Sequence, residues 1–161
     1  MTEKLLKSPE PNSPQLDQII KLAIKYLRKI NCDLALCLGD SVAEVAEQLR
    51  RYGINTLWLN HNQGHALYQT GTADDQTNFL TKIAGHYQKP VIVEDTMVSG
   101  GKMWQLRNTF QAAGIHFQAV VLAAEKDLAD TGIHLISSDP KIISELRTRV
   151  SRFINSRNNL F

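Results

Sequence analysis

The feature that most limits the possible folds of this chain is a regular alternation of short apolar runs with amphipathic segments. The apolar residues in these runs are mostly consecutive and do not strictly alternate with polar ones, as expected for strands buried on both faces. They cover residues 34–38, 54–59, 91–93, 117–124 and 133–137. Apolar residues recur every three or four positions between most of these runs, which is the spacing of helices that cover a sheet. The alternation predicts an α/β domain with a parallel sheet and helices on both faces.

Several of the expected helices carry end signals. The first should span residues 15–30, and the last should begin with Asp139 as N-cap and Pro140 as its first residue. Ser41 and Glu44 form a capping-box pattern, which predicts that Ser41 starts the second helix. Glycines at 53 and 114 and Asp75 mark further helix ends.

Length and composition place the chain among soluble globular proteins. A chain of 161 residues, with 43% hydrophobic and 21% charged residues, is long enough for one domain with a core. We expect a flexible N-terminal arm over residues 1–14, which has no signal-like apolar stretch, and a single domain over 15–161. We also expect a cytoplasmic protein without membrane contact, because no apolar run approaches about 20 residues.

Charge and cysteine content exclude other classes of partner. The formal net charge of +2 does not indicate a nucleic-acid surface, and the arginines near the C-terminus read as a solvated helix face. The two cysteines, Cys32 and Cys37, indicate neither a disulfide framework nor a metal site, and Cys37 reads as a small buried hydrophobe.

Residues 90–102 are the stretch that we expect to form a functional site. Three branched apolar residues are followed by Glu94 and Asp95, and then by a turn at residues 99–101 that opens a helix. Backbone N–H groups and the positive helix end face such a turn, which makes it an anion cradle. The two carboxylates accept hydrogen bonds from vicinal hydroxyls, so a ribose phosphate would satisfy both halves of the site.

These residues resemble the phosphoribosyl-pyrophosphate motif of the type I phosphoribosyltransferases. That motif is a hydrophobic strand, an acidic pair and a Ser/Thr-Gly loop opening a helix, and residues 91–93, Glu94, Asp95, Ser99 and Gly100 fit it. The chain departs from the motif at Pro90, Thr96 and Lys102. The resemblance covers roughly residues 33 to 124 and implies a five-stranded parallel core.

The resemblance also implies a reaction, in which ribose 5-phosphate passes to a nitrogenous base and pyrophosphate leaves. It implies that Glu94 and Asp95 hold the ribose hydroxyls and that Mg²⁺ binds through the diphosphate of the substrate. The implied 5′-phosphate site comprises Thr96, Met97, Val98, Ser99, Gly100, Gly101 and Lys102. The leaving pyrophosphate would meet Gly39, Asp40 and Ser41. The substrates are phosphoribosyl pyrophosphate and a nucleobase or nucleotide, and a homodimer is common in the family.

One departure supports a second function, a non-catalytic nucleotide-binding regulatory module with the same fold. The family carries Lys or Arg residues in a loop after the second core strand, whereas residues 52–81 here contain neither. The negative charge of Asp40 would also repel a diphosphate. Only His61 and His65 offer partial charge in that loop. Other cations that could reach the site are Arg50, Arg51 and Lys82. Residues 61–74 and 125–140 are the candidates for choosing the base.

Two further interpretations stay open. The sequence around Ser41 resembles that of GDSL-type esterases, with Ser41 as nucleophile and His134 as base, although Asp130 lies four residues before the histidine, where that family has three. The other is an ordinary strand, turn and helix with a solvated acidic pair. Trp58 and Trp104 are expected to pack in the core.

Overall fold

The computed structural model describes residues 12–59, 82–83, 86–97, 101–125 and 132–158. Its helices are α1 (Pro14–Lys29), the 3-10 helix η2 (Asp40–Val42), α2 (Ala43–Arg51), α5 (Gly101–Ala112) and α6 (Pro140–Asn158). Its strands are β1 (Leu34–Leu38), β2 (Thr56–Leu59), β3 (Pro90–Met97), β4 (Ala119–Ala124) and β5 (Ile133–Ser137). Each of the five predicted runs therefore forms a strand, with small differences at the ends.

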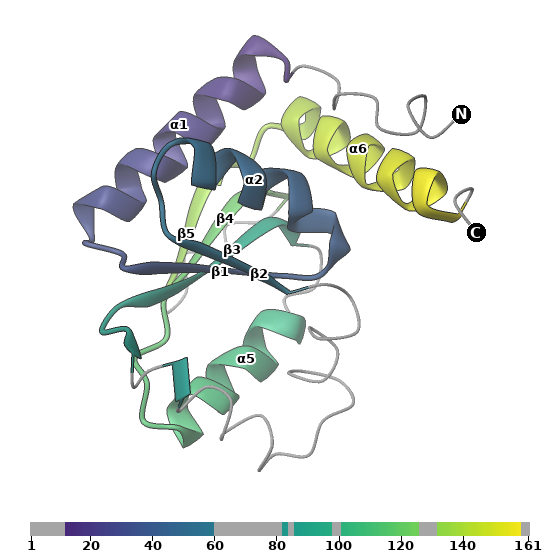
Figure 1. Ribbon diagram of the computed structural model, residues 1–161. Coiled ribbons are helices and arrows are strands. Elements are labelled where there is room, and N and C mark those ends of the chain that lie inside the picture. The colour runs from purple at the N-terminus through teal and green to yellow at the C-terminus, as the bar shows by residue number, and fades with distance from the viewer. Residues whose placement is uncertain (1–11, 60–81, 84–85, 98–100, 126–131, 159–161) are drawn as a thin grey trace.

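The strands form one parallel sheet in the order β2-β1-β3-β4-β5, which confirms the predicted fold class (Figure 1). β1 pairs with β3 only from Leu34 opposite Pro90 to Leu36 opposite Ile92. Beyond Ile92, β3 continues beside β4, with Glu94 opposite Val121 and further pairs up to Ala124. β1 and β3 are thus neighbours, and the later strands are added outward from each of them. The pairing between β1 and β3 ends before either strand ends.

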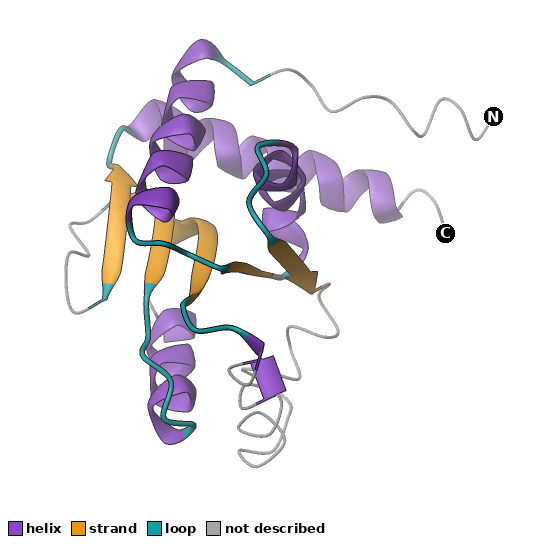
Figure 2. Cartoon of the chain, turned by 60° about the vertical axis from the view of Figure 1, so that its left-hand side comes forward, coloured by secondary structure: helices purple, strands orange, loops and turns teal. Residues whose placement is uncertain are grey.

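Helices cover the two faces unequally, as Figures 1 and 2 show. α1, α2 and α6 lie on one face, where they share a core with residues such as Cys37, Val93 and Leu122. α5 covers the other face, where Leu106 and Phe110 pack against the sheet. β1 and β4 are buried along their whole length because both of their faces are covered, whereas β2 and β5 at the edges are partly exposed.

The start of α1 is anchored to α6. The Ser13 hydroxyl accepts from the Leu16 N–H at 3.1 Å and donates to Glu145 Oε2 at 2.5 Å, while the Ser13 N–H donates to Glu145 Oε1 at 2.9 Å. Pro14 occupies the first turn, where its missing N–H is harmless. Residues 12–14, which the sequence assigned to the N-terminal arm, therefore belong to the folded domain, and residues 1–11 lie outside the described part.

Two local expectations are corrected. β3 continues through Met97, so the acidic pair lies inside the strand rather than after it. Ser41 is not a helix cap: it lies in η2, and α2 begins after Val42 without a side-chain capping bond. Cys37 is fully buried, as predicted, and burial raises the pKa of the half-buried Cys32 thiol to about 11.

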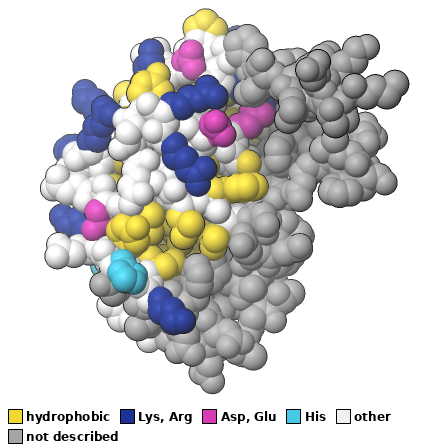
Figure 3. Space-filling view, viewed as in Figure 1, with side chains coloured by type: hydrophobic (Ala, Val, Ile, Leu, Met, Phe, Trp, Pro, Cys, Tyr) yellow, Lys and Arg dark blue, Asp and Glu magenta, His cyan; other side chains and the backbone are white. Residues whose placement is uncertain are grey.

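The described surface offers two observations on partners. On the face shown in Figure 3, Lys and Arg side chains are spread among Asp and Glu, so this face carries no continuous basic patch over the described residues. None of the described helices combines the length and apolar character needed to cross a membrane.

Candidate functional site

The carboxyl ends of β1 and β3 form the topological switch point of the sheet, where the strand order reverses. From β1 the chain moves outward to β2, and from β3 it moves the opposite way to β4 and β5. In open parallel sheets this switch point leaves a crevice, because the loops from the two strands diverge. The turn after β1 and the acidic pair of β3 lie at the carboxyl ends of these two neighbouring strands, and the site role of residues 39–41 and 94–95 stays a prediction.

Glu94 and Asp95 are buried to an unusual degree for carboxylates. Their exposed fractions are 4% and 2%. Asp95 Oδ1 accepts a hydrogen bond from the Ser41 hydroxyl at 3.4 Å. Asp95 Oδ2 is buried and has no hydrogen-bond partner among the described residues. Because buried polar atoms nearly always have partners, an unpaired carboxylate oxygen at a crevice marks a place for an external donor. The pair is therefore not a solvated one.

The protonation of Asp95 differs from that of a surface carboxylate. Burial raises the pKa of Asp95 well above its usual range, and the adjacent Glu94 carboxylate raises it further. Two adjacent carboxyls in a dry site disfavour a second negative charge. Donors from a ligand would relieve this penalty, since hydrogen bonds to a carboxylate stabilise its charged form.

The turn after β1 is held from β2. Gly39 adopts a φ of 100°, which favours glycine, and its N–H donates to the Leu59 carbonyl at 2.9 Å. The Trp58 indole N–H donates to the Gly39 carbonyl at 2.7 Å. The Gly39 amide is therefore occupied by a carbonyl of β2, and its role toward pyrophosphate stays a prediction. The described position of Asp40 is its backbone in η2.

Trp58 is a site residue that sequence reasoning missed. It was expected in the core, and it does pack partly against the core beneath α2. Its indole N–H also fixes the turn of the candidate site. A buried tryptophan needs a hydrogen-bond partner, and this is the signal that could have indicated a polar neighbour. Trp104 was wrongly placed in the core, because 62% of it is exposed on α5.

Only part of the predicted phosphate cradle is described. Thr96 and Met97 end β3, where Thr96 is half-buried and Met97 is buried, and Gly101 and Lys102 begin α5. Val98, Ser99 and Gly100 lie outside the described residues, as does the Lys102 side chain. The backbone on both sides nevertheless places the N-terminus of α5 directly after the acidic strand.

Of the cations suggested as substitutes for the missing loop lysines, the two arginines contact other groups. The Arg50 Nε donates to the Thr56 carbonyl at the start of β2, and Arg51 pairs with Glu47 at 3.5 Å. Both arginines lie in the last turn of α2, whereas the candidate site adjoins its start. Lys82 is exposed, and residues 61–74 lie outside the described part.

The hydrolase arrangement is not assembled. The described hydrogen bond of Ser41 goes to Asp95, and not to a histidine. His134 stacks on Tyr26 of α1, with ring centroids 3.7 Å apart, and lies opposite Val120 near the amino end of β5. Ser41 lies at the carboxyl edge of the sheet, so a nucleophile and base cannot meet as that interpretation required. Asp130 lies outside the described residues.

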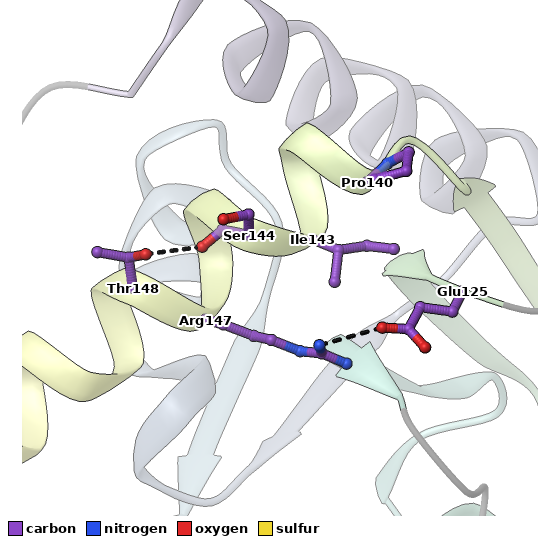
Figure 4. Close-up of a pocket in the computed structure, with 6 residues that line it drawn as sticks. All are labelled: Glu125, Pro140, Ile143, Ser144, Arg147 and Thr148. Atoms are coloured by element: carbon purple, nitrogen blue, oxygen red, sulfur yellow. Dashed lines mark hydrogen bonds and ion pairs between the residues drawn. The ribbon is translucent and has the colours of Figure 1, made fainter.

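A hollow of about 310 Å³ lies on the same edge of the sheet, between the end of β4 and α6. Figure 4 shows Arg147 reaching from α6 toward Glu125, and these two side chains form an ion pair at 3.1 Å. Ser144 and Thr148 lie along the same helix beside it. Glu125 and Pro140 fall within the region 125–140 that was expected to help choose the base.

Among solved structures the chain is similar to hypoxanthine phosphoribosyltransferases. The enzyme from Leishmania tarentolae, titled HGPRT-ase in complex with GMP, is 13% identical, with a TM-score of 0.49 over 78% of this chain and 75% of that one. The Staphylococcus aureus hypoxanthine phosphoribosyltransferase is 13% identical, with a TM-score of 0.49 over 87% and 82%. The Trypanosoma cruzi protein is 10% identical, with a TM-score of 0.43 over 78% and 75%. Neither a family model nor a curated protein sequence matches the chain.

Proposed function

We propose that the crevice between β1 and β3 binds phosphoribosyl pyrophosphate or a nucleoside 5′-monophosphate. The proposed reaction transfers ribose 5-phosphate to a nitrogenous base and releases pyrophosphate. The observation that supports this most is the buried acidic pair at the switch point, with Asp95 Oδ2 buried and unpartnered among the described residues. Ribose hydroxyls are hydrogen-bond donors, which is what a buried carboxylate oxygen without a partner requires.

In this proposal each element has a separate task. Glu94 and Asp95 accept the ribose hydroxyls in a dry site, where such hydrogen bonds are stronger than in water. The N-terminus of α5 faces the 5′-phosphate, since it follows the acidic strand after three residues. Ser41 holds one Asp95 oxygen in place, so the other oxygen stays directed at the ligand.

Magnesium enters this proposal on the substrate. No group of three His, Cys, Asp or Glu side chains that could hold a metal lies within the described ranges. Mg²⁺ usually keeps several waters and binds through substrate phosphates, so it needs no dedicated protein cage here. Bound Mg²⁺ would neutralise negative charge on the diphosphate as it leaves.

The second candidate is a nucleotide-binding regulatory module without catalysis. It is favoured by the positions of Arg50 and Arg51, which engage other groups away from the crevice, and by the occupied Gly39 amide. Together with the Lys- and Arg-free stretch 52–81, these features leave fewer donors for a diphosphate than for the single phosphate of a nucleotide.

The test is calorimetric titration of wild type, Asp95→Asn and a control with phosphoribosyl pyrophosphate plus Mg²⁺. Asp95→Asn removes a charged acceptor, so affinity should fall by about one to two decades. The control is Asp139→Asn, which changes the same group at an exposed helix cap where asparagine serves equally well. Unchanged affinity in Asp95→Asn would remove ribose recognition from this site.

A parallel titration with ribose 5-phosphate separates the two candidates. An enzyme should bind phosphoribosyl pyrophosphate with Mg²⁺ more tightly than ribose 5-phosphate, and should release pyrophosphate when purines, pyrimidines or orotate are supplied. Equal affinities without pyrophosphate release would favour the regulatory module.

A further inference from the structure

A second pocket lies at the opposite edge of the sheet, where the strands begin. Its volume is about 390 Å³, within the range of small-molecule sites. Three loops line it, namely those that lead into β1, β3 and β4, which are neighbours in the sheet. Its polar lining residues are Lys29, Asn31, Gln88, Lys89, His116 and Gln118. Figure 1 shows the last turn of α1 on the same side as the starts of β1 and β3.

The pocket is lined by donors. Two lysines supply positive charge, and three side-chain amides and an imidazole supply neutral or ionisable N–H groups. Among the described residues, no carboxylate lines the pocket. The nearby Asp33 accepts the backbone N–H groups of Gln88 at 2.6 Å and Lys89 at 2.8 Å, one on each carboxylate oxygen. These two bonds tie the segment before β3 to the segment before β1, and so fix a loop of the pocket.

The walls are also held in place by the backbone. Asn31 adopts a φ of 56°, and its N–H donates to the Arg28 carbonyl at 3.1 Å. The Ile30 and Cys32 N–H groups donate to the Tyr26 and Leu27 carbonyls, so the exposed carbonyls of the helix end are partly occupied. This weakens the negative field that the C-terminus of α1 would otherwise present.

We propose that this pocket binds a small dianion, either a phosphate group or a dicarboxylate. Lys29 and Lys89 would supply charge from two different loops, while Asn31, Gln88 and Gln118 would complete the hydrogen bonds. The site is separate from the acidic crevice. Pro90, which directly follows the lining residue Lys89, is five residues from Asp95 on the same strand, which corresponds to roughly 17 Å. The proposal therefore stands whether or not the crevice binds phosphoribosyl pyrophosphate.

The test is an NMR titration of ¹⁵N-labelled full-length protein with sodium phosphate and, separately, with succinate, at constant ionic strength. Amides of residues 29–31, 88–89 and 116–118 should shift together and saturate. The stronger of the two titrations would identify the anion type. Phosphate that binds at the crevice instead would shift residues 39–42 and 94–97, so the two sites are read out independently.

Variants decide whether the two lysines are responsible. Lys29→Gln combined with Lys89→Gln should weaken binding at the pocket at least about tenfold, because two charged donors are lost. Both lysines are exposed, so folding should persist, and a thermal melt checks this. The matched control is Lys25→Gln with Lys141→Gln, two exposed lysines elsewhere. Linear shifts without saturation for both anions, or equal weakening in the control, would overturn the proposal.

Discussion

Asp95 is a buried carboxyl whose hydrogen bonding is incomplete among the described residues. It is 2% exposed, the Ser41 hydroxyl donates to its Oδ1 over 3.4 Å, and its Oδ2 has no hydrogen-bond partner among the described residues. A carboxyl in such surroundings favours the protonated form, and Glu94 beside it adds to this preference. An enzyme or binding protein can maintain this unfavourable arrangement because a ligand supplies the missing donors.

Asp95→Asn should therefore stabilise the ligand-free protein increasingly as pH rises. Well below the ordinary Asp pKa of about 3.9, Asp95 is protonated in both states and the folded chain gains nothing. Above that value the unfolded chain releases the proton while the folded one keeps it, so wild-type stability falls toward the raised pKa. Thermal melts from pH 4 to 8 should show a widening difference in Tm, about 2 to 4 °C per kcal/mol. A constant offset would contradict this account.

At the scale of elements, a polar network connects α1, α2 and α6 on one side of the sheet. Ser13 caps α1 and donates to Glu145 of α6. Arg149, only 13% exposed at its side chain, lies 3.3 Å from Glu44 in the first turn of α2 and 3.8 Å from Glu145. Since η2 and the start of α2 flank the acidic crevice, this network fixes one wall of the candidate site.

Ser13→Ala should destabilise the domain by about 1 to 2 kcal/mol. It removes an N-cap and the hydroxyl donor to Glu145 at once, and a lost cap alone costs about 1 kcal/mol. Urea denaturation at neutral pH measures the effect. Thr148→Ala is a suitable control, because its exposed hydroxyl donates to the Ser144 carbonyl of its own helix at 2.9 Å. Similar losses in both variants would show that the Ser13 contact with α6 adds no stability.

Across the whole molecule, the sheet separates two hydrophobic cores. Leu122 belongs to the core beneath α1, α2 and α6, and Leu106 to the core beneath α5. Both side chains are fully buried. The central strands contribute residues to each core alternately, so neither face can form without the other.

Leu122→Ala and Leu106→Ala should each reduce the free energy of unfolding by about 2 to 5 kcal/mol. Because the two side chains lie on opposite faces without shared partners, the double variant should equal the sum of the single ones within about 0.5 kcal/mol. Denaturant titrations followed by circular dichroism and by tryptophan fluorescence should give coincident transitions. Separate transitions would indicate that the two faces unfold independently.

The sequence alone determined the elements that depend on neighbouring residues. The predicted bounds of β1 and β5 match the structure, and α6 begins as expected, with the Asp139 carboxylate accepting the Lys141 N–H at 2.9 Å. Gly53 and Gly114 follow helices with φ of 83° and 73°. Such signals lie within a few residues of the structure they specify, as does the run that placed an acidic pair near the end of a buried strand.

Tertiary structure decided which distant groups meet, and this defines the candidate site. Ser41 has the local pattern of a helix cap, yet its hydroxyl bonds Asp95, 54 residues away, because β1 and β3 are neighbours in the sheet. The Trp58 indole N–H likewise donates to the Gly39 carbonyl because their segments are neighbours in the fold. The Arg50 Nε donates to the Thr56 carbonyl. The depth of burial that leaves Asp95 with an unpaired oxygen also comes from packing on both faces of β3. Local patterns cannot report such contacts, since the energies that select them arise only when separate elements pack together.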